Sequence, residues 1–413
     1  MLVGSLRGFG PGIISGAADD DPAGIATYSI AGAQFGLTLL WLAPVTWPFM
    51  AAVQGMCARV GMVTGGGLMD ALRQKLPAPL LLLVAMSLFL ANTFNIGADL
   101  AGMADAAEML THIDSRVFVV AFGIGIAAAT VGWRYATIAH VLKWLVLSLA
   151  AYMIAAISLD PDWREVARAT ALPAIPRGSA ALATIVAILG TTISPYLFFW
   201  QASEEVEEEK SMGRATRAAR TGASRREIRG RDFDVAAGTL ASNTTFFFIT
   251  LTTALTLHQS GITQPETSTE VAAALRPLAG SFATLLYTIG IVGTGLLAIP
   301  ILAGSAAYAL AELFGWQEGM DERPSRAPGF YSIFALSVTS AVLMDFAEFS
   351  VVRVLYWSAV INGLLAPFVL AGILAVASDR KIMEGQPSSR LAQATVLITT
   401  IAMFAAGAAM FIL

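Results

Sequence analysis

Two short motifs place oxygen-bearing, helix-breaking residues inside apolar segments that are long enough to cross a membrane. They are Asp19–Gly24, with the sequence DDDPAG, and Gly190–Pro195, with the sequence GTTISP. A carboxylate or an unwound backbone is costly in hydrocarbon and persists where it faces a cavity, a partner or an ion. Two such breaks at matching places in the two halves of a chain are typical of a transporter's substrate site. The pattern therefore favours an ion carrier.

The residue types at both breaks indicate the kind of ion. Pro22 and Pro195 cannot donate to a helix, so carbonyl oxygens just before each break are freed. The predicted oxygen donors are the Asp21 carboxylate, the carbonyls near Ala18 and Thr191, and the hydroxyls of Thr192 and Ser194. An all-oxygen set without sulfur or imidazole suits a hard cation such as Mg²⁺, Ca²⁺ or Mn²⁺.

Other polar residues in the apolar segments leave alternatives open. Asp19 and Asp20 fit helix caps or solvated positions as well as an ion site. Asp99 fits either a partner of the site or a charge at the membrane interface. Asn95 and Asn362 fit contacts to the ion's waters and hydrogen bonds between helices equally well.

The composition is that of an integral membrane protein. Of 413 residues, 56% are hydrophobic and only 13% are charged, with a mean hydropathy of +0.69. Soluble proteins have about 25% charged residues. The single Cys57 excludes a disulfide framework and a thiolate cluster, and three widely separated histidines argue against a histidine metal cage.

A bilayer crossing needs about 20 apolar residues, and the chain holds eleven candidate spans. They are 8–40 (split near the three aspartates), 37–57, 78–98, 117–132, 135–158, 180–202, 235–257, 278–310, 330–344, 354–377 and 391–413. The polar stretch 203–234 is a charged cytoplasmic loop and helix extension, with weakly signalled binding of anionic lipid as an alternative. No soluble domain is long enough to fold alone, so we predict a single polytopic transmembrane domain over residues 1–413.

The distribution of lysine and arginine predicts the orientation. With the N-terminus in the cytoplasm, eighteen basic residues lie inside and six lie outside. The predicted chain is a multi-pass protein of the inner (plasma) membrane, with its C-terminus outside.

At the two breaks and elsewhere, the chain resembles the Nramp family of divalent-metal transporters, most closely its magnesium-transporting branch. The motifs that carry the resemblance are GPG at 10–12, DPAGIATY from Asp21, NIGADL at 95–100, LGTTISPY at 189–196, and Asn362-Gly363 before Pro367. They extend over nearly the whole chain. The resemblance implies an all-α, leucine-transporter-like fold with unwound helices 1 and 6. It also implies two inverted repeats at about 8–158 and 180–377, followed by an extra helix at about 391–413.

The resemblance also implies roles for individual residues. Asp21 matches the metal-binding aspartate of the family, and Thr191 the position that donates a carbonyl. Gly24 stands where an asparagine ligand is usual, and Ser194 replaces a methionine whose sulfur favours softer metals. Losing the thioether and opening the site is consistent with a partly hydrated Mg²⁺, which dehydrates reluctantly.

Three departures from the family concern proton movement. Tyr196 replaces a histidine, Gly102 replaces a glutamate, and the span 330–344 lacks the usual arginines, although Asp99 matches a family carboxylate. A titratable relay, which proton coupling requires, is thereby largely removed.

We therefore predict a carrier without a cofactor that moves Mg²⁺, and also Mn²⁺, by alternating access without proton coupling. Its predicted partners are the metal ion and the lipid bilayer, with no nucleic acid, and we expect a monomer. The predicted metal-binding residues are Asp21, Ala18, Gly24, Thr191, Thr192, Ser194, Asp20, Asn362 and Asp99. The main alternative is a proton-coupled transporter of Mn²⁺ and other transition metals. An intramembrane hydrolase using Asp21 and Asp99, or a metal sensor without transport, are weaker alternatives because zinc and serine-nucleophile motifs and a signalling domain are missing.

Overall fold

The computed structural model describes residues 10–132, 147–346 and 350–412, and all regular elements within these ranges are helices. In these ranges, seven helical segments are long and apolar enough to cross a membrane. A further pair of such segments, Pro22–Leu39 and Leu42–Thr64, meets at an angle of 113°. This is a reversal of the chain between two predicted spans. The predicted all-α membrane architecture is confirmed.

The helices of the first half follow the predicted spans. They are α1 (Pro11–Asp19), α2 (Pro22–Phe35), η1 (Gly36–Leu39), α3 (Leu42–Thr64), α4 (Leu68–Leu72), α5 (Ala78–Thr111), α6 (Ser115–Gly132), η2 (Leu147–Leu149), α8 (Ala150–Ser158) and α9 (Trp163–Ala171). The predicted span 135–158 lies outside the described residues up to position 146. Both α3 and α5 run past the predicted ends of their spans.

The second half begins with another broken helix. Its elements are α10 (Ser179–Thr192), α11 (Pro195–Ser211), α12 (Arg217–Arg220), α13 (Arg225–Thr253), the π-helical turn η3 (Ala254–His258), α14 (Ser268–Ala273), α15 (Arg276–Ala279), η4 (Gly280–Phe282), α16 (Ala283–Phe314), α17 (Pro328–Met344), α18 (Val351–Ala377) and α19 (Arg390–Ile412). The predicted loop 203–234 is helical over much of its length, because α11 continues to Ser211 and α13 begins at Arg225.

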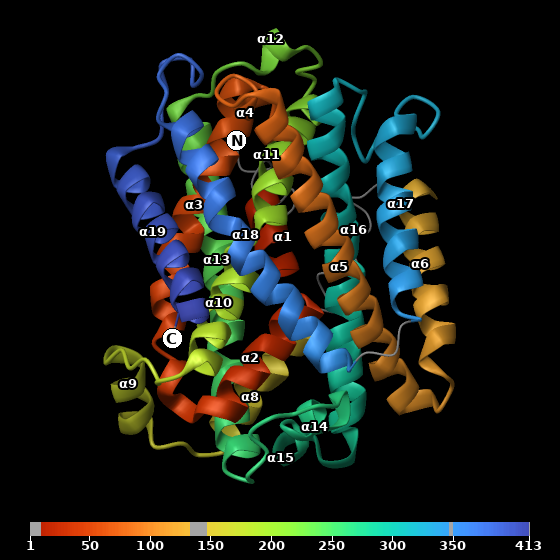
Figure 1. Ribbon diagram of the computed structural model, residues 1–413, viewed down its shortest axis with the longest axis vertical. Coiled ribbons are helices and arrows are strands. Elements are labelled where there is room, and N and C mark those ends of the chain that lie inside the picture. Colours follow the sequence, from red (N-terminus) through yellow and green to blue (C-terminus); the bar gives the residue numbers. More distant parts are fainter. Residues whose placement is uncertain (1–9, 133–146, 347–349, 413) are drawn as a thin grey trace, which may run out of the picture.

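The two broken helices lie inside the bundle, surrounded by longer helices (Figure 1). The α1 helix packs along α13, and α10 packs along α18, while α5 contacts α16, α17 and α18. In Figure 1, α19 lies at one side of the bundle, and α6 and α17 lie at the other. The basic segment around α12 lies at the end opposite α9, α14 and α15.

Paired glycines hold both broken helices against their neighbours. A Cβ on Gly16 of α1 would collide with the backbone of Gly238 on α13. A Cβ on Gly190 of α10 would likewise collide with backbone atoms of Gly363 on α18. Small residues let membrane helices approach closely, which increases van der Waals contact where lipid offers no hydrophobic driving force. These contacts fix the first half of each broken helix.

Candidate metal-binding site

The first break is a capped helix start inside the protein. The α1 helix ends at Asp19, and Asp21 is the N-cap of α2, with Pro22 in the first turn. One Asp21 carboxylate oxygen, Oδ1, accepts the Gly24 backbone N–H at 2.6 Å. Aspartate is a favoured N-cap, and proline tolerates the first helical turn. The local sequence thus explains the break.

The Asp21 carboxylate is also connected to α5 and α18. Asn95 donates from Nδ2 to Asp21 Oδ2 at 3.0 Å and to Asp99 Oδ2 at 3.3 Å. Asp99 Oδ1 accepts the backbone N–H of Ala23 at 3.2 Å, and Asn362 donates to Asn95 Oδ1 at 3.4 Å. The side-chain cluster of Asp21, Asn95, Asp99 and Asn362 is buried, with each residue at most 3% exposed.

The other two aspartates of the motif point to a different helix. Ser242 of α13 lies with its hydroxyl 2.7 Å from Asp19 Oδ2 and 3.0 Å from Asp20 Oδ1. Asp19 Oδ1 is buried without a hydrogen-bond partner among the described residues. The three consecutive carboxylates therefore divide, with Asp21 facing α5, and Asp19 and Asp20 facing α13. Neither solvent nor a conventional helix cap explains Asp19 and Asp20.

The second break satisfies its freed carbonyls internally. Ser194 is the N-cap residue of α11, and its hydroxyl lies 2.6 Å from the Gly190 carbonyl and 2.9 Å from the Thr191 carbonyl. Thr192 donates its hydroxyl to the Ile188 carbonyl of its own helix at 2.8 Å. The Thr192 hydroxyl is therefore used by a hydrogen bond within α10, and one lone pair of the Thr191 carbonyl oxygen is used by the Ser194 hydroxyl.

The two breaks meet at Gly24 and at Ala18. A Cβ built on Gly24 would lie only 2.9 Å from Thr191 Oγ1 and 3.2 Å from Asp21 Oδ1. Glycine therefore allows α2 to approach the second break. Tyr196 of α11 donates its hydroxyl to the Ala18 carbonyl at 3.1 Å, which leaves that oxygen one further lone pair.

Of the predicted site residues, the structure brings Asp21, Asp99 and Asn362 together through Asn95, and places Gly24 beside Thr191. Asp20 lies on the α13 side of the break.

Sequence reasoning missed Ser242, because a serine in a helix rich in Ser and Thr carries no distinguishing signal. In the described part of the chain, no three carboxylate, imidazole or thiolate groups are arranged to hold a metal by themselves. Neutral oxygens or water would have to complete a shell around Asp21.

A second polar network lies between the break and the end of the bundle that carries α12. Arg231 of α13 has its Nε 2.7 Å from a Glu205 carboxylate oxygen and its Nη1 2.8 Å from Asp234 Oδ2, and it also pairs with Glu208. Asp234 Oδ2 accepts the Gly12 N–H of α1 at 2.8 Å. The Glu205 residue is 1% exposed, so it is enclosed in protein and is not part of a solvated face.

Two further hydrogen bonds continue this network along α1 and α11. Ser15 donates to Gln201 Oε1 at 2.7 Å, and Gln201 donates to Glu205 Oε1 at 2.8 Å. The starting parts of α1 and α13 are thereby joined to α11 on one side of the break.

Comparison with known proteins identifies relatives over most of the chain. The family model described as Natural resistance-associated macrophage protein-like (Nramp) matches residues 12–413. A divalent metal cation transporter MntH of Acidiphilium cryptum is 25% identical over 383 residues, which are 89% of this chain and 86% of that protein. The MntH protein of Pectobacterium carotovorum is 26% identical over 304 residues, covering 70% of this chain and 68% of that protein.

Solved structures show the same architecture. A manganese transporter of Eremococcus coleocola matches with a TM-score of 0.74 at 16% identity, covering 96% of this chain and 84% of that one. Mhp1, a nucleobase-cation-symport-1 family transporter, matches with a TM-score of 0.58 at 16% identity, over 98% of this chain and 90% of that one. These similarities establish the leucine-transporter-like fold that the family resemblance implies.

Proposed function

This chain belongs to the Nramp family, and from that premise we propose that it carries divalent metal cations across the plasma membrane by alternating access, with Mg²⁺ favoured and Mn²⁺ also accepted. As a member of this family it is a membrane transporter and not an enzyme. The metal ion is its substrate, and we propose that transport needs no cofactor.

The observation that carries the proposal is the buried Asp21 carboxylate at the meeting point of the two breaks. A dication in a low-dielectric interior needs a nearby negative charge. Asp21 supplies it, and the Thr191 hydroxyl approaches the same side of Gly24 as Asp21 Oδ1. The Ala18 carbonyl, which Tyr196 ties to the second break, is the further neutral oxygen that we propose for the ion. Asp99 and Asn362 would orient these groups through Asn95, while Asp20 would add charge from the α13 side.

The preference for Mg²⁺ rests on the absence of a soft ligand at Ser194 and on the small size of Gly24. Oxygen donors alone suit Mg²⁺, which keeps part of its water shell in proteins. Where the family usually has a methionine sulfur, this chain has the Ser194 hydroxyl, which already contacts two backbone carbonyls. Placement in the magnesium-transporting branch remains part of this proposal.

The proposal includes transport without proton coupling. The Tyr196 hydroxyl donates to the Ala18 carbonyl. Gly102 is closely packed, because a Cβ at this position would lie 3.2 Å from Leu355 and 3.6 Å from Pro22. Neither position holds a group that titrates near neutral pH. One observation favours the alternative, a proton-coupled Mn²⁺ transporter. Asp99 is a second buried carboxylate, joined to Asp21 through Asn95.

We further propose that the chain works as a monomer with its N-terminus in the cytoplasm and its C-terminus outside. In that orientation the network around Arg231 closes the cytoplasmic side of the site. Release of the ion to the cytoplasm then requires α1 and α11 to separate from α13 there.

Uptake by proteoliposomes tests the proposed function. We expect saturable uptake of Mg²⁺ and Mn²⁺, accelerated by an inside-negative valinomycin potential, with no change in a pH-sensitive dye in the lumen. Metal-dependent acidification that disappears in Asp99→Asn would instead establish the proton-coupled alternative. Protein-free liposomes control for leak, and absence of uptake of all divalent ions in folded protein would contradict metal transport itself.

A further inference from the structure

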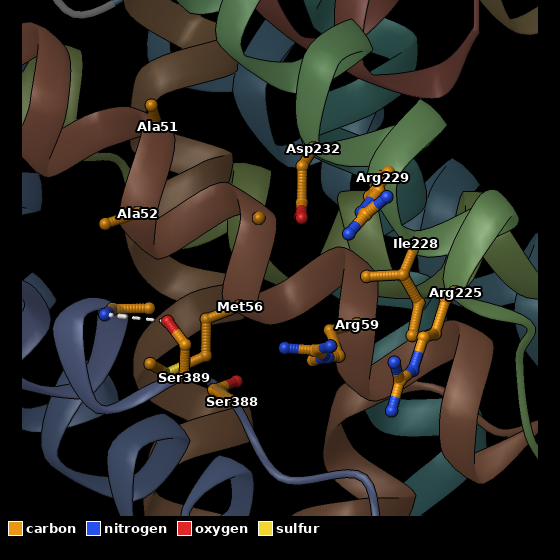
Figure 2. A pocket seen from close by; sticks show the side chains of 12 residues that line it. Ala51, Ala52, Met56, Arg59, Arg225, Ile228, Arg229, Asp232, Ser388 and Ser389 are labelled. Carbon is orange, nitrogen blue, oxygen red and sulfur yellow. Dashed lines mark hydrogen bonds between the residues drawn. The ribbon is translucent and has the colours of Figure 1, made fainter.

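A basic pocket lies apart from the metal site, between α3, α13 and the start of α19. It has a volume of about 590 Å³ and is lined by side chains from these three segments (Figure 2). The pocket belongs to the end of the bundle at which α13 and α19 begin and α3 finishes. In Figure 1, α19 lies at one side of the bundle, and the residues that line the pocket include none of the cluster around Asp21 or of the network around Arg231.

Two helix faces give the pocket a charged end and an apolar end. On α3, Ala52, Met56 and Arg59 recur at helical spacing and line one wall. On α13, Arg225 and Arg229 line the facing wall. Between Ala52 and Arg59 the wall extends about 10 Å along the helix. The arginines lie toward the outer end of the bundle, and the small apolar residues continue from them toward its middle.

Two polar atoms at the charged end have no hydrogen-bond partner in the described part of the protein. Arg59 Nε and the Ser388 hydroxyl are buried there without a hydrogen bond, and Ser388 is only 5% exposed. Arg214 and Arg231, by contrast, pair with carboxylates. Buried polar groups are normally satisfied, and all of these groups are hydrogen-bond donors. A ligand that satisfies them must therefore supply acceptor oxygens.

One acidic side chain lines the pocket. Asp232 of α13 faces Gly55 of α3, so that its Oδ1 would lie 3.8 Å from a Cβ at that glycine. It lies on the α13 face with Arg225 and Arg229, and Figure 2 shows it beside Arg229. Three arginines against one aspartate leave the lining positive, with Asp232 opposing any bound anion.

We propose that this pocket binds the headgroup of an anionic phospholipid. The phosphate oxygens accept hydrogen bonds from Arg59, Arg225 and Ser388, and an acyl chain follows the apolar wall at Ala52 and Met56. Guanidinium groups recognise phosphate through paired hydrogen bonds. A free phosphate would use only the charged end, whereas a lipid uses both ends. The lipid would come from the cytoplasmic leaflet, because the proposed orientation places this end of the bundle in the cytoplasm. Anionic lipids of that leaflet attract basic residues.

Native mass spectrometry of the full-length protein tests this proposal by comparing phosphatidylglycerol with phosphatidylcholine. We expect preferential retention of phosphatidylglycerol by the wild-type protein. Arg59→Gln and Arg225→Gln should each weaken it about fivefold. Arg226→Gln is the matched control, because it removes the same charge one residue away from Arg225 but does not line the pocket. Equal retention of both lipids, or equal losses in the control, would refute the site.

A variant of opposite sign separates binding from general damage to the fold. Asp232→Asn removes the opposing charge and should strengthen phosphatidylglycerol retention about fivefold. Displacement of the lipid by inorganic phosphate would identify a free anion as the ligand and overturn the lipid assignment. Metal uptake by Arg59→Gln in phosphatidylcholine liposomes should match that of wild type, so a failure of this proposal leaves the proposed transport function untouched.

Discussion

Both broken helices place polar groups inside the protein, and different residue types satisfy these groups at the two breaks. The first break carries three carboxylates, and neighbouring helices hold them through Asn95 and Ser242. The second break is neutral, and the Ser194 hydroxyl contacts the carbonyls that the break releases. An unpaired charge needs partners from elsewhere in the fold, whereas a freed carbonyl can be satisfied locally. For the proposed ion site, the first break would supply the balancing charge and the second would supply neutral oxygen ligands.

The largest effect is expected from removing charge at the first break. Asp21→Ala should lower Mg²⁺ and Mn²⁺ uptake by about a hundredfold or more, because Asp21 is the carboxylate that caps α2 at Gly24, beside Thr191 of the second break. Uptake into proteoliposomes measures it, after thermal unfolding has shown that the variant is folded.

Asp20→Asn is the matched control for Asp21→Ala. It changes the neighbouring carboxylate, which faces Ser242 on α13, and we expect a loss of less than about fivefold. Equal losses in the two variants would mean that the three aspartates act as one cluster, and the division between α5 and α13 would have no functional meaning.

A change in selectivity is expected from the second break. Ser194→Met places a soft ligand there and releases the Gly190 and Thr191 carbonyls, so the Mn²⁺-to-Mg²⁺ affinity ratio should rise about tenfold. Calorimetric titration measures the ratio. An added Gly24→Asn should raise it further only if Thr191 moves, since Cβ would approach Thr191 Oγ1 to 2.9 Å. An unchanged ratio in Ser194→Met would show that the second break does not set selectivity.

The smallest effect is expected at Thr192. Its hydroxyl bonds to the Ile188 carbonyl within α10, so Thr192→Val should keep uptake within about twofold of wild type. Valine preserves shape, and the matched variant Ser194→Ala removes a hydroxyl from the same break. A large loss in Thr192→Val would place its oxygen on the ion after all.

The sequence predicts the helices well because their signals are local. Pro22 and Pro195 determine where α2 and α11 begin, and long apolar runs determine the spans. The directions of Asp19, Asp20 and Asp21 could not be predicted, because adjacent side chains diverge around a break according to tertiary contacts. Ser242 lies 222 positions from Asp20 in the chain, and no local pattern links such residues.

The site residues also divide into those that local motifs predict and those that depend on tertiary contacts. Asp21 and Gly24 follow from a motif that combines charge with a broken backbone. The bond from Tyr196 to Ala18 depends on how two segments 178 positions apart pack, and the sequence indicates only that Tyr196 replaces a histidine of the family. The division of the chain into repeats at 8–158 and 180–377 stays a prediction, as do the orientation and the monomeric state.

The hydrogen bonds between α1 and α11 have a mechanical consequence. Ser15 contacts Gln201 and Ala18 contacts Tyr196 directly, whereas Gly12 and Glu205 are connected only through Asp234 and Arg231 of α13. The two direct bonds lie at successive levels along both half-helices, so neither half-helix can swing alone without breaking both. We therefore expect α1 and α11 to move together as one unit about the break. In the proposed orientation, coupled movement of α1 and α11 would give the cytoplasmic passage few intermediate widths, so hydrated ions would not leak through a partly open protein.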